Sequence, residues 1–179
     1  MNTANKLTIL RILLVPLFLF FLLTRQISLA ITAFAFASVT DFIDGYVARK
    51  YKQVTTFGKF IDPLADKILT ISAFLAFIEM GLLPSWAVFI IITRELAVTA
   101  LRSLAAAEKE IIAASMLAKL KTVTQIVAII AIMLSQMPAL VEYTWVYTAA
   151  LYLFGLCVFM TLLSFVDYFK KCLRFMKFK

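Results

Sequence analysis

Four aspartates lie inside or at the ends of apolar segments between positions 41 and 66. Asp41 and Asp44 are three residues apart, and Asp62 and Asp66 are four residues apart. In a helix, either spacing places both carboxylates on one face. An ionisable group at membrane depth is costly, so a cluster of four requires a strong compensating partner. A divalent cation is the simplest partner for clustered carboxylates.

The donor atoms favour Mg²⁺ or Mn²⁺ over zinc. The chain has four aspartate side chains in this region and no histidine anywhere, and oxygen donors suit the harder cations. The lack of histidine also excludes a His-based triad and a His zinc site. Unneutralised, the four acids would repel one another. Two metal ions about 4 Å apart would remove that repulsion, and such pairs stabilise in-line displacement at phosphorus.

Small and basic residues accompany the acids. Gly45 and Ala48 share a helix face with the first aspartate pair, and Gly58 opens the next apolar segment. Missing side chains allow helices to approach closely, or allow a flat ligand group to lie against the backbone. Arg49 can bind a phosphate. The alternative is an ion-paired helix bundle without chemistry, which gives no reason for four acids facing small or basic residues.

The elements that position these residues are expected to be membrane-spanning helices. Hydrophobic residues make up 64% of the 179 positions, whereas a soluble domain is nearer half apolar. A membrane span needs about 20 mostly apolar residues. Six segments qualify, over residues 7–24, 29–48, 60–80, 86–106, 121–136 and 145–168. We predict an all-α polytopic membrane protein with six transmembrane helices, forming a single domain over residues 1–179.

Positive charges predict the orientation. If both termini are cytoplasmic, the turns after the first, third and fifth spans face outward, and they hold one basic residue, Arg25. The other loops and ends are rich in lysine and arginine, as the positive-inside rule requires. This arrangement puts the aspartates at the cytoplasmic side. The spans that carry them, joined by a short loop, are expected to pack as antiparallel neighbours.

The acids, small residues and arginine together form a known pattern. With its spacing it reads Asp41-x2-Asp44-Gly45-x2-Ala48-Arg49-x8-Gly58-x3-Asp62-x3-Asp66. It resembles the full signature of the CDP-alcohol phosphotransferase family, and the six-span layout resembles that family's fold. The resemblance implies transfer of a phosphatidyl or similar group from a CDP-linked donor to an alcohol, with release of CMP.

The same resemblance implies roles for individual residues. Asp41, Asp44 and Asp62 would bind metal, and Asp66 would help to hold the second metal and act as the general base. The CDP-binding set would be Asp41, Asp44, Gly45, Ala48, Arg49 and Gly58.

Cations outside the signature suggest an acceptor that carries a phosphate. Arg94 and Arg102 lie in the fourth span, and Lys119 and Lys121 open the fifth. Cations at one end of neighbouring helices can form a phosphate pocket, although snorkelling is the alternative for each, and an ion pair with Glu95 is a further one for Arg94.

The segments around these cations, and the opening that contains Asn5 and Thr8, resemble the family branch that uses CDP-diacylglycerol and sn-glycerol 3-phosphate. A lipid donor would place the site at the inner headgroup boundary of the cell membrane, where the glycerol 3-phosphate would arrive from the cytoplasm.

Other functions remain open at this level. A sister enzyme could use inositol phosphate, serine or phosphatidylglycerol as acceptor, and a divalent-cation transporter could use the same aspartates. A transporter usually shows repeated halves, and we find no repeat here. The net charge of +8 is too dispersed to indicate nucleic-acid binding. The family resemblance suggests a homodimer.

Overall fold

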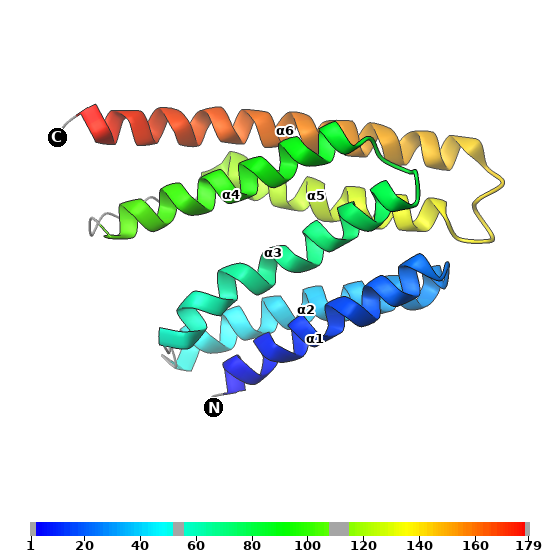
Figure 1. Cartoon of the computed structure of the whole chain (residues 1–179), viewed down its shortest axis with the longest axis horizontal. Coiled ribbons are helices and arrows are strands. Elements are labelled where there is room, and N and C mark those ends of the chain that lie inside the picture. Colours follow the sequence, from blue (N-terminus) through cyan, green and yellow to red (C-terminus); the bar gives the residue numbers. More distant parts are fainter. Residues whose placement is uncertain (1–2, 52–55, 108–114, 178–179) are drawn as a thin grey trace. The chain divides into compact units, whose positions relative to one another are not determined.

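The computed structural model describes the backbone of residues 3–51, 56–107 and 115–177, and the side chains of residues 10–40, 67–103 and 115–170. All the regular elements in these ranges are α-helices, as predicted (Figure 1). In chain order they are α1 (Thr3–Leu23), α2 (Ile27–Tyr51), α3 (Thr56–Glu79), α4 (Ser85–Ala107), α5 (Met116–Ser135) and α6 (Thr144–Lys177).

Close packing divides the chain into two units of three helices, Met1–Leu82 and Leu83–Lys179. In the first unit, α1 packs against both α2 and α3. Its core contains Phe18, Phe34, Phe74 and Phe77, all with almost no exposed surface. The Phe18 and Phe34 rings are tilted, with centroids 5.5 Å apart, a separation typical of favourable aromatic pairs.

The expected pairing of α2 with α3 is only partly observed. Among the described residues these two helices touch sparingly, and most of their packing is against α1. A short connection brings helix ends together, but the bulk of the side chains determines which helix faces pack along their length. The phenylalanines of this unit favour α1 as the common partner.

In the second unit, α6 is the common partner of α4 and α5. Ile91, Ile129 and Phe154 are buried in its core. Small and polar residues of α6 are buried as well, including Cys157, Thr161 and Ser164. Cys157 is a free thiol. Small side chains allow close helix approach, which matters in lipid because apolar contact alone does not drive helices together there.

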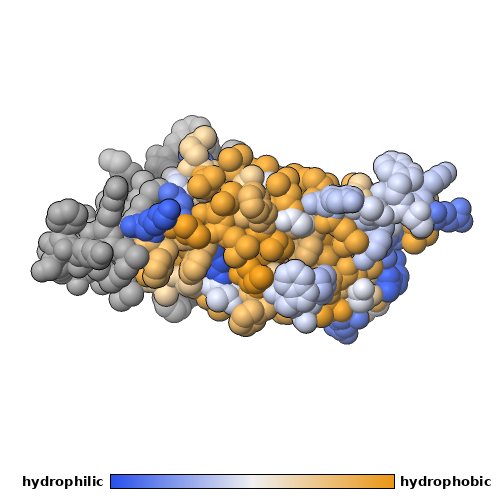
Figure 2. Space-filling model, turned by 90° about the horizontal axis from the view of Figure 1, so that it is seen from above, coloured by the Kyte–Doolittle hydropathy of each residue, from blue (hydrophilic) through white to orange (hydrophobic). Residues whose placement is uncertain are grey.

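Large apolar side chains cover much of the surface. Phe36, Phe89, Trp145 and Tyr152 are each more than half exposed, at 55%, 69%, 69% and 78%. Figure 2 shows a broad apolar expanse on the face in view, with hydrophilic side chains on both sides of it along the long axis. Exposed apolar patches of this extent mark contact with another apolar surface or phase, which agrees with the predicted location in a bilayer.

Two helices in the described part of the chain are long and apolar enough to cross a membrane, Met116–Ser135 and Thr144–Lys170. Shorter apolar stretches are found at Leu10–Leu23 and Ile27–Thr40. A helix occupies each of the six predicted segments. That all six cross the bilayer stays a prediction, as does the single domain over residues 1–179.

Two of the turns contain the same backbone motif. At the end of α3, the Leu82 N–H donates to the Phe77 carbonyl and the Gly81 N–H to the Ile78 carbonyl, at 2.8 and 2.9 Å. These are the two bonds of a Schellman motif, which needs a left-handed residue. Gly81 supplies it with φ of 72°. Arg25 takes the same role after α1 with φ of 62°, a conformation that is strained for a residue with a Cβ.

Candidate active site

The aspartates lie on the helices that the sequence predicts. Asp41 and Asp44 are part of α2, and Asp62 and Asp66 are part of α3. The helical backbone therefore gives each pair the spacing of one helix face. Their side chains, with those of Gly45, Ala48, Arg49, Gly58, Asn5 and Thr8, lie outside the described side chains.

The donor set fits a hard divalent cation. Four carboxylates on two helices offer oxygen atoms alone, which match Mg²⁺ or Mn²⁺. Within the described side chains, no group of three or more His, Cys, Asp or Glu residues could hold a metal. The assignment of a metal site to the aspartates of α2 and α3 stays a prediction.

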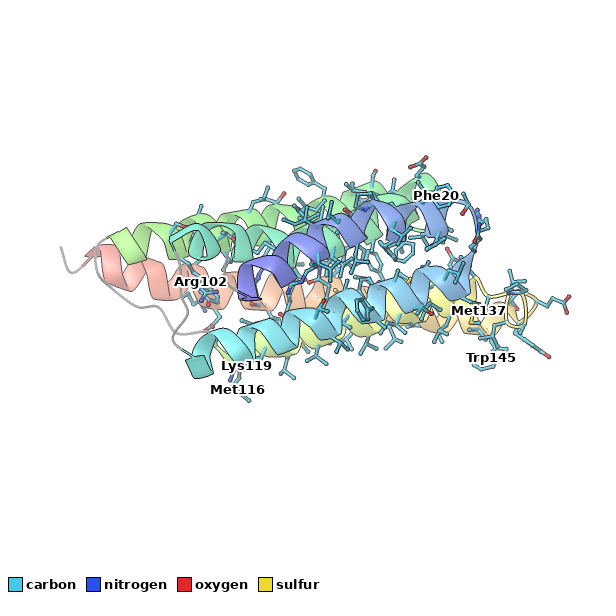
Figure 3. The ribbon with its side chains drawn as sticks, turned by 90° about the horizontal axis from the view of Figure 1, so that it is seen from below. Phe20, Arg102, Met116, Lys119, Met137 and Trp145 are labelled. Carbon is cyan, nitrogen blue, oxygen red and sulfur yellow. The ribbon has the colours of Figure 1, made fainter. Side chains whose placement is uncertain are left out.

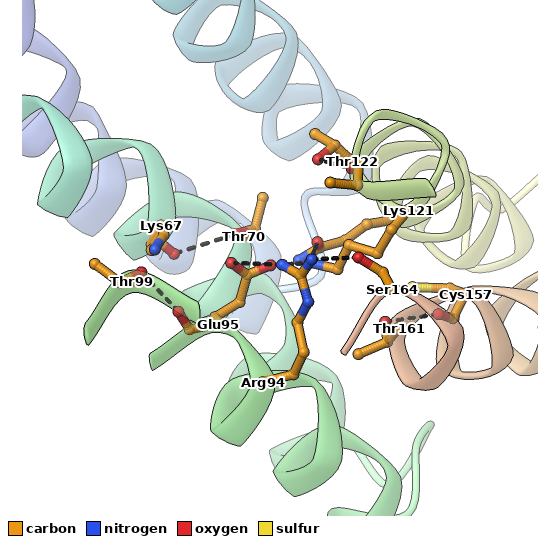
Figure 4. Close-up of polar contacts among 12 residues, drawn as sticks. Lys67, Thr70, Arg94, Glu95, Thr99, Lys121, Thr122, Cys157, Thr161 and Ser164 are labelled. Atoms are coloured by element: carbon orange, nitrogen blue, oxygen red, sulfur yellow. Dashed lines mark hydrogen bonds and ion pairs between the residues drawn. The ribbon is translucent and has the colours of Figure 1, made fainter. Parts of the chain in front are cut away.

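A polar cluster joins the helices of the second unit, and two of the predicted phosphate-binding residues are in it (Figure 4). Lys121 on α5 donates to the Glu95 carboxylate on α4 and also to the Gln125 side-chain carbonyl one turn further along α5. The Lys121 side chain is 1% exposed and that of Glu95 is 13% exposed. Burying an ammonium is costly unless it is paired, and here both acceptors satisfy it.

Arg94 lies beside this pair and reaches the third helix. Its guanidinium donates to the Ser164 hydroxyl on α6 and lies over the Tyr168 ring, 5.9 Å from its centre. One guanidinium nitrogen is 3.7 Å from the Glu95 carboxylate. The ion pair with Glu95 is thus present, and the cation–π contact adds to it. Snorkelling is wrong for Arg94 and Lys121, because both side chains are almost fully buried.

Arg102 and Lys119 are placed differently. Both are exposed, and Figure 3 shows them at the same end of the second unit, opposite Met137 and Trp145. Two helical turns separate Arg102 from Arg94 along α4, about 12 Å at 1.5 Å per residue. The structure therefore brings Arg94 and Lys121 together and leaves Arg102 and Lys119 at the surface of the same end.

Three residues that contact the cations, Gln125, Ser164 and Tyr168, are not predicted from the sequence as their partners. One signal was available. Thr161, Ser164 and Tyr168 repeat at helical spacing on one face of α6, and all three are buried. A polar stripe inside an apolar helix indicates a contact with another helix, although it does not say with which residue.

Comparison with known proteins identifies the class. The family model for CDP-alcohol phosphatidyltransferases matches residues 1–166, so the chain belongs to this family, as its signature indicates. It is 42% identical to the CDP-diacylglycerol–glycerol-3-phosphate 3-phosphatidyltransferase of Bacillus subtilis (strain 168), over 95% of this chain and 94% of the relative.

Two further relatives carry related names. A probable phosphatidylglycerophosphate synthase of Mycobacterium tuberculosis (strain ATCC 25618 / H37Rv) is 40% identical over 97% of this chain and 82% of its own length. The CDP-diacylglycerol–glycerol-3-phosphate 3-phosphatidyltransferase of Rickettsia typhi (strain ATCC VR-144 / Wilmington) is 34% identical over 96% of this chain and 97% of its own length. The similarity thus extends over nearly the whole chain.

Proposed function

We propose that this chain transfers a phosphatidyl group from CDP-diacylglycerol to sn-glycerol 3-phosphate. The products are phosphatidylglycerol phosphate and CMP. The observation that carries this function is the identity of 34–42% with relatives named for the reaction, over at least 95% of this chain. The matched family and the buried cations of α4 and α5 support it.

The reaction is a displacement at phosphorus. A hydroxyl oxygen of glycerol 3-phosphate bonds to the phosphorus that bears the diacylglycerol, and the bond from that phosphorus to the CMP oxygen breaks. The hydroxyl proton passes to Asp66, the general base, and the electron pair of the broken bond leaves with CMP. A carboxylate within hydrogen-bond reach of a hydroxyl can accept its proton in this way. No covalent enzyme intermediate is required.

Asp41, Asp44, Asp62 and Asp66 would hold two Mg²⁺ or Mn²⁺ ions. When bound, such ions polarise the diphosphate and stabilise the charge of the departing CMP. Gly45, Ala48 and Gly58 would leave room for the cytidine.

Other residues of the first unit would help to bind the substrates. Arg49 would lie near the nucleotide, where a guanidinium can bind phosphate oxygens in pairs. Asn5 and Thr8 would contribute from the start of α1.

The acceptor's phosphate would bind the cations of the second unit. Arg94 and Lys121 would contact it directly, and Arg102 and Lys119 would attract it electrostatically from the surface. A phosphorylated acceptor uses this positive charge better than serine, which has no phosphate. The positive charge therefore argues against serine, and the names of the relatives favour glycerol 3-phosphate over the other phosphorylated acceptors.

A lipid donor requires a membrane location. We place all six helices across the cell membrane, with both termini and the active site on the cytoplasmic side. The reactive diphosphate of CDP-diacylglycerol lies at headgroup level, with the acyl chains in the bilayer. We expect a homodimer.

Release of CMP by purified protein in detergent tests this function. The protein is supplied with CDP-diacylglycerol and, in turn, glycerol 3-phosphate, inositol phosphate, serine or phosphatidylglycerol, each with and without Mg²⁺. We expect glycerol 3-phosphate with Mg²⁺ to give by far the fastest release. If CMP release with glycerol 3-phosphate is no faster than with buffer in its place, the substrate assignment is refuted. If another acceptor gives the fastest release, that acceptor identifies the sister activity.

A further inference from the structure

The two cations assigned to the acceptor phosphate share one carboxylate. Glu95 receives the Lys121 ammonium on one oxygen and lies 3.7 Å from the Arg94 guanidinium with the other. A phosphate that binds Lys121 would make the same kind of charge-assisted hydrogen bond. The Glu95 carboxylate therefore occupies the position on Lys121 that an anionic ligand would need.

Two donors in this cluster have no acceptor. Arg94 Nε and Gln125 Nε2 are buried donors without a hydrogen-bond partner, and the two residues are 7% and 4% exposed. Buried donors are normally satisfied, so two unsatisfied donors beside the Glu95–Lys121 pair are consistent with a further acceptor, such as a phosphate oxygen, binding here.

Side chains make the link between α4 and α5 in this cluster. α4 and α5 each pack against α6, and no close approach of their backbones is found among the described residues. The Glu95–Lys121 pair bridges α4 and α5 through two long side chains. Long side chains can change rotamer without moving a helix, so Lys121 can exchange one anionic partner for another locally.

We propose that Glu95 is a positioning residue for the acceptor, an inference that rests on the proposed function. Its carboxylate holds Lys121 and Arg94 in place while the site is empty, and it yields Lys121 to the phosphate of glycerol 3-phosphate. The Glu95 carboxylate and the substrate phosphate therefore compete for Lys121. The carboxylate makes acceptor binding weaker than the cations alone would allow, and it keeps both buried cations neutralised between turnovers.

Replacement of the carboxylate by its amide separates these two roles. Glu95→Gln keeps the size of the side chain and an oxygen that can accept from Lys121, but it removes the competing charge. We expect KM for glycerol 3-phosphate to fall about five- to tenfold, with kcat and the KM for CDP-diacylglycerol unchanged. Inorganic phosphate should inhibit this variant more strongly by a similar factor.

A second readout does not depend on turnover. Inorganic phosphate should raise the thermal unfolding temperature of Glu95→Gln more than that of the unmodified protein. At a given concentration, a ligand stabilises the folded state more when its affinity is higher. The matched control is Glu142→Gln, which removes one negative charge from an exposed position in the turn before α6. This control should leave both the KM and the phosphate effect unchanged.

A structural role alone gives a different pattern. Glu95→Gln should lower the unfolding temperature under either account, because it leaves two buried cations without a carboxylate. If Glu95 only stabilised the bundle, KM for glycerol 3-phosphate would be unchanged or raised in this variant, and either KM result overturns the proposal. If that variant does not fold, Glu95→Asp retains the charge with a shorter reach, and its KM should still fall by about twofold; an unchanged KM overturns the proposal. Absence of glycerol 3-phosphate-dependent CMP release by the unmodified protein would instead refute the proposed function.

Discussion

Two buried cations in α4 and α5 are stabilised by different partners. Lys121 is held by a carboxylate and an amide oxygen, and Arg94 by a hydroxyl, an aromatic face and a more distant carboxylate. The planar guanidinium suits the second environment, because it can donate at its edge and stack with its face. Lysine at position 94 would not reproduce both contacts.

Ser164→Ala tests the contact between Arg94 and α6. The variant leaves a buried guanidinium hydrogen without its acceptor, and such a loss costs about 1–3 kcal/mol of folding free energy. We expect a lower unfolding temperature in detergent than for the unmodified protein. Ser103→Ala, at an exposed position of α4, is the control and should unfold at the original temperature. Equal unfolding temperatures for the two variants would show that the Ser164 contact contributes nothing.

Some of these residue contacts were predictable and others were not. The sequence places Arg94 next to Glu95, so their ion pair could be proposed from adjacency. The contact between Arg94 and Ser164 joins residues 70 positions apart, and it depends on how α4 packs on α6. Single-sequence patterns give the face of a helix but not its partner. The assignment of the aspartates to metal depends on their chemistry and spacing, and it stays a prediction.

At the scale of elements, apolar segments predict where helices lie better than where they end. The first and third turns fall where polar or turn-forming residues interrupt the apolar runs. The fifth helix begins at Met116 rather than at 121, because the Ser115 side chain accepts a bond from the Ala118 N–H and caps the helix. α6 continues to Lys177 rather than ending at 168. A polar surface ends a membrane span, but it does not end a helix.

Two glycines in different backbone conformations should respond in opposite directions to alanine. A Cβ at Gly81 or at Gly155 meets no atom within 4 Å, so backbone preference decides the outcome. Gly81 has a left-handed φ of 72°, and alanine there should destabilise the fold by about 1 kcal/mol. Gly155 is inside α6, where alanine should stabilise it by about 0.5–1 kcal/mol.

Thermal unfolding of Gly81→Ala and Gly155→Ala in the same detergent measures both effects, and each variant serves as the control of the other. A stabilised Gly81→Ala protein would contradict the Schellman motif at the end of α3. A destabilised Gly155→Ala protein would indicate that the exposed face of α6 there contacts another molecule, such as the second subunit of the expected dimer.

At the scale of the whole molecule, the distribution of charge and of apolar surface predicts the orientation in the membrane. The exposed apolar side chains require a surrounding apolar phase, and the basic residues gather at the helix ends that we assign to the cytoplasm. Trp86 and Trp145, both more than half exposed, begin α4 and α6 at the opposite ends. Aromatic residues prefer the membrane–water interface, which agrees with this orientation.

Thiol labelling of intact cells tests the orientation. Single cysteines are introduced as Gln26→Cys, Val141→Cys or Lys170→Cys, at positions exposed in the structure, in a chain that also carries Cys157→Ala and Cys172→Ala. A membrane-impermeant maleimide should label positions 26 and 141 in intact cells, and position 170 only after permeabilisation. The reverse pattern would place the aspartates on the outer side, away from a cytoplasmic acceptor.

We propose that carboxylates on α2 and α3 carry out a metal-dependent phosphatidyl transfer. Incorporation of labelled glycerol 3-phosphate into chloroform-extractable lipid by the purified protein, with CDP-diacylglycerol and Mg²⁺, tests this proposal. We expect rapid incorporation by the unmodified protein and none in the presence of a chelator. The rate for Asp66→Asn should be at least about 10²-fold lower, and the rate for Glu142→Gln should be unchanged. Normal incorporation by Asp66→Asn, or undiminished incorporation without a divalent metal, would refute the role of these carboxylates.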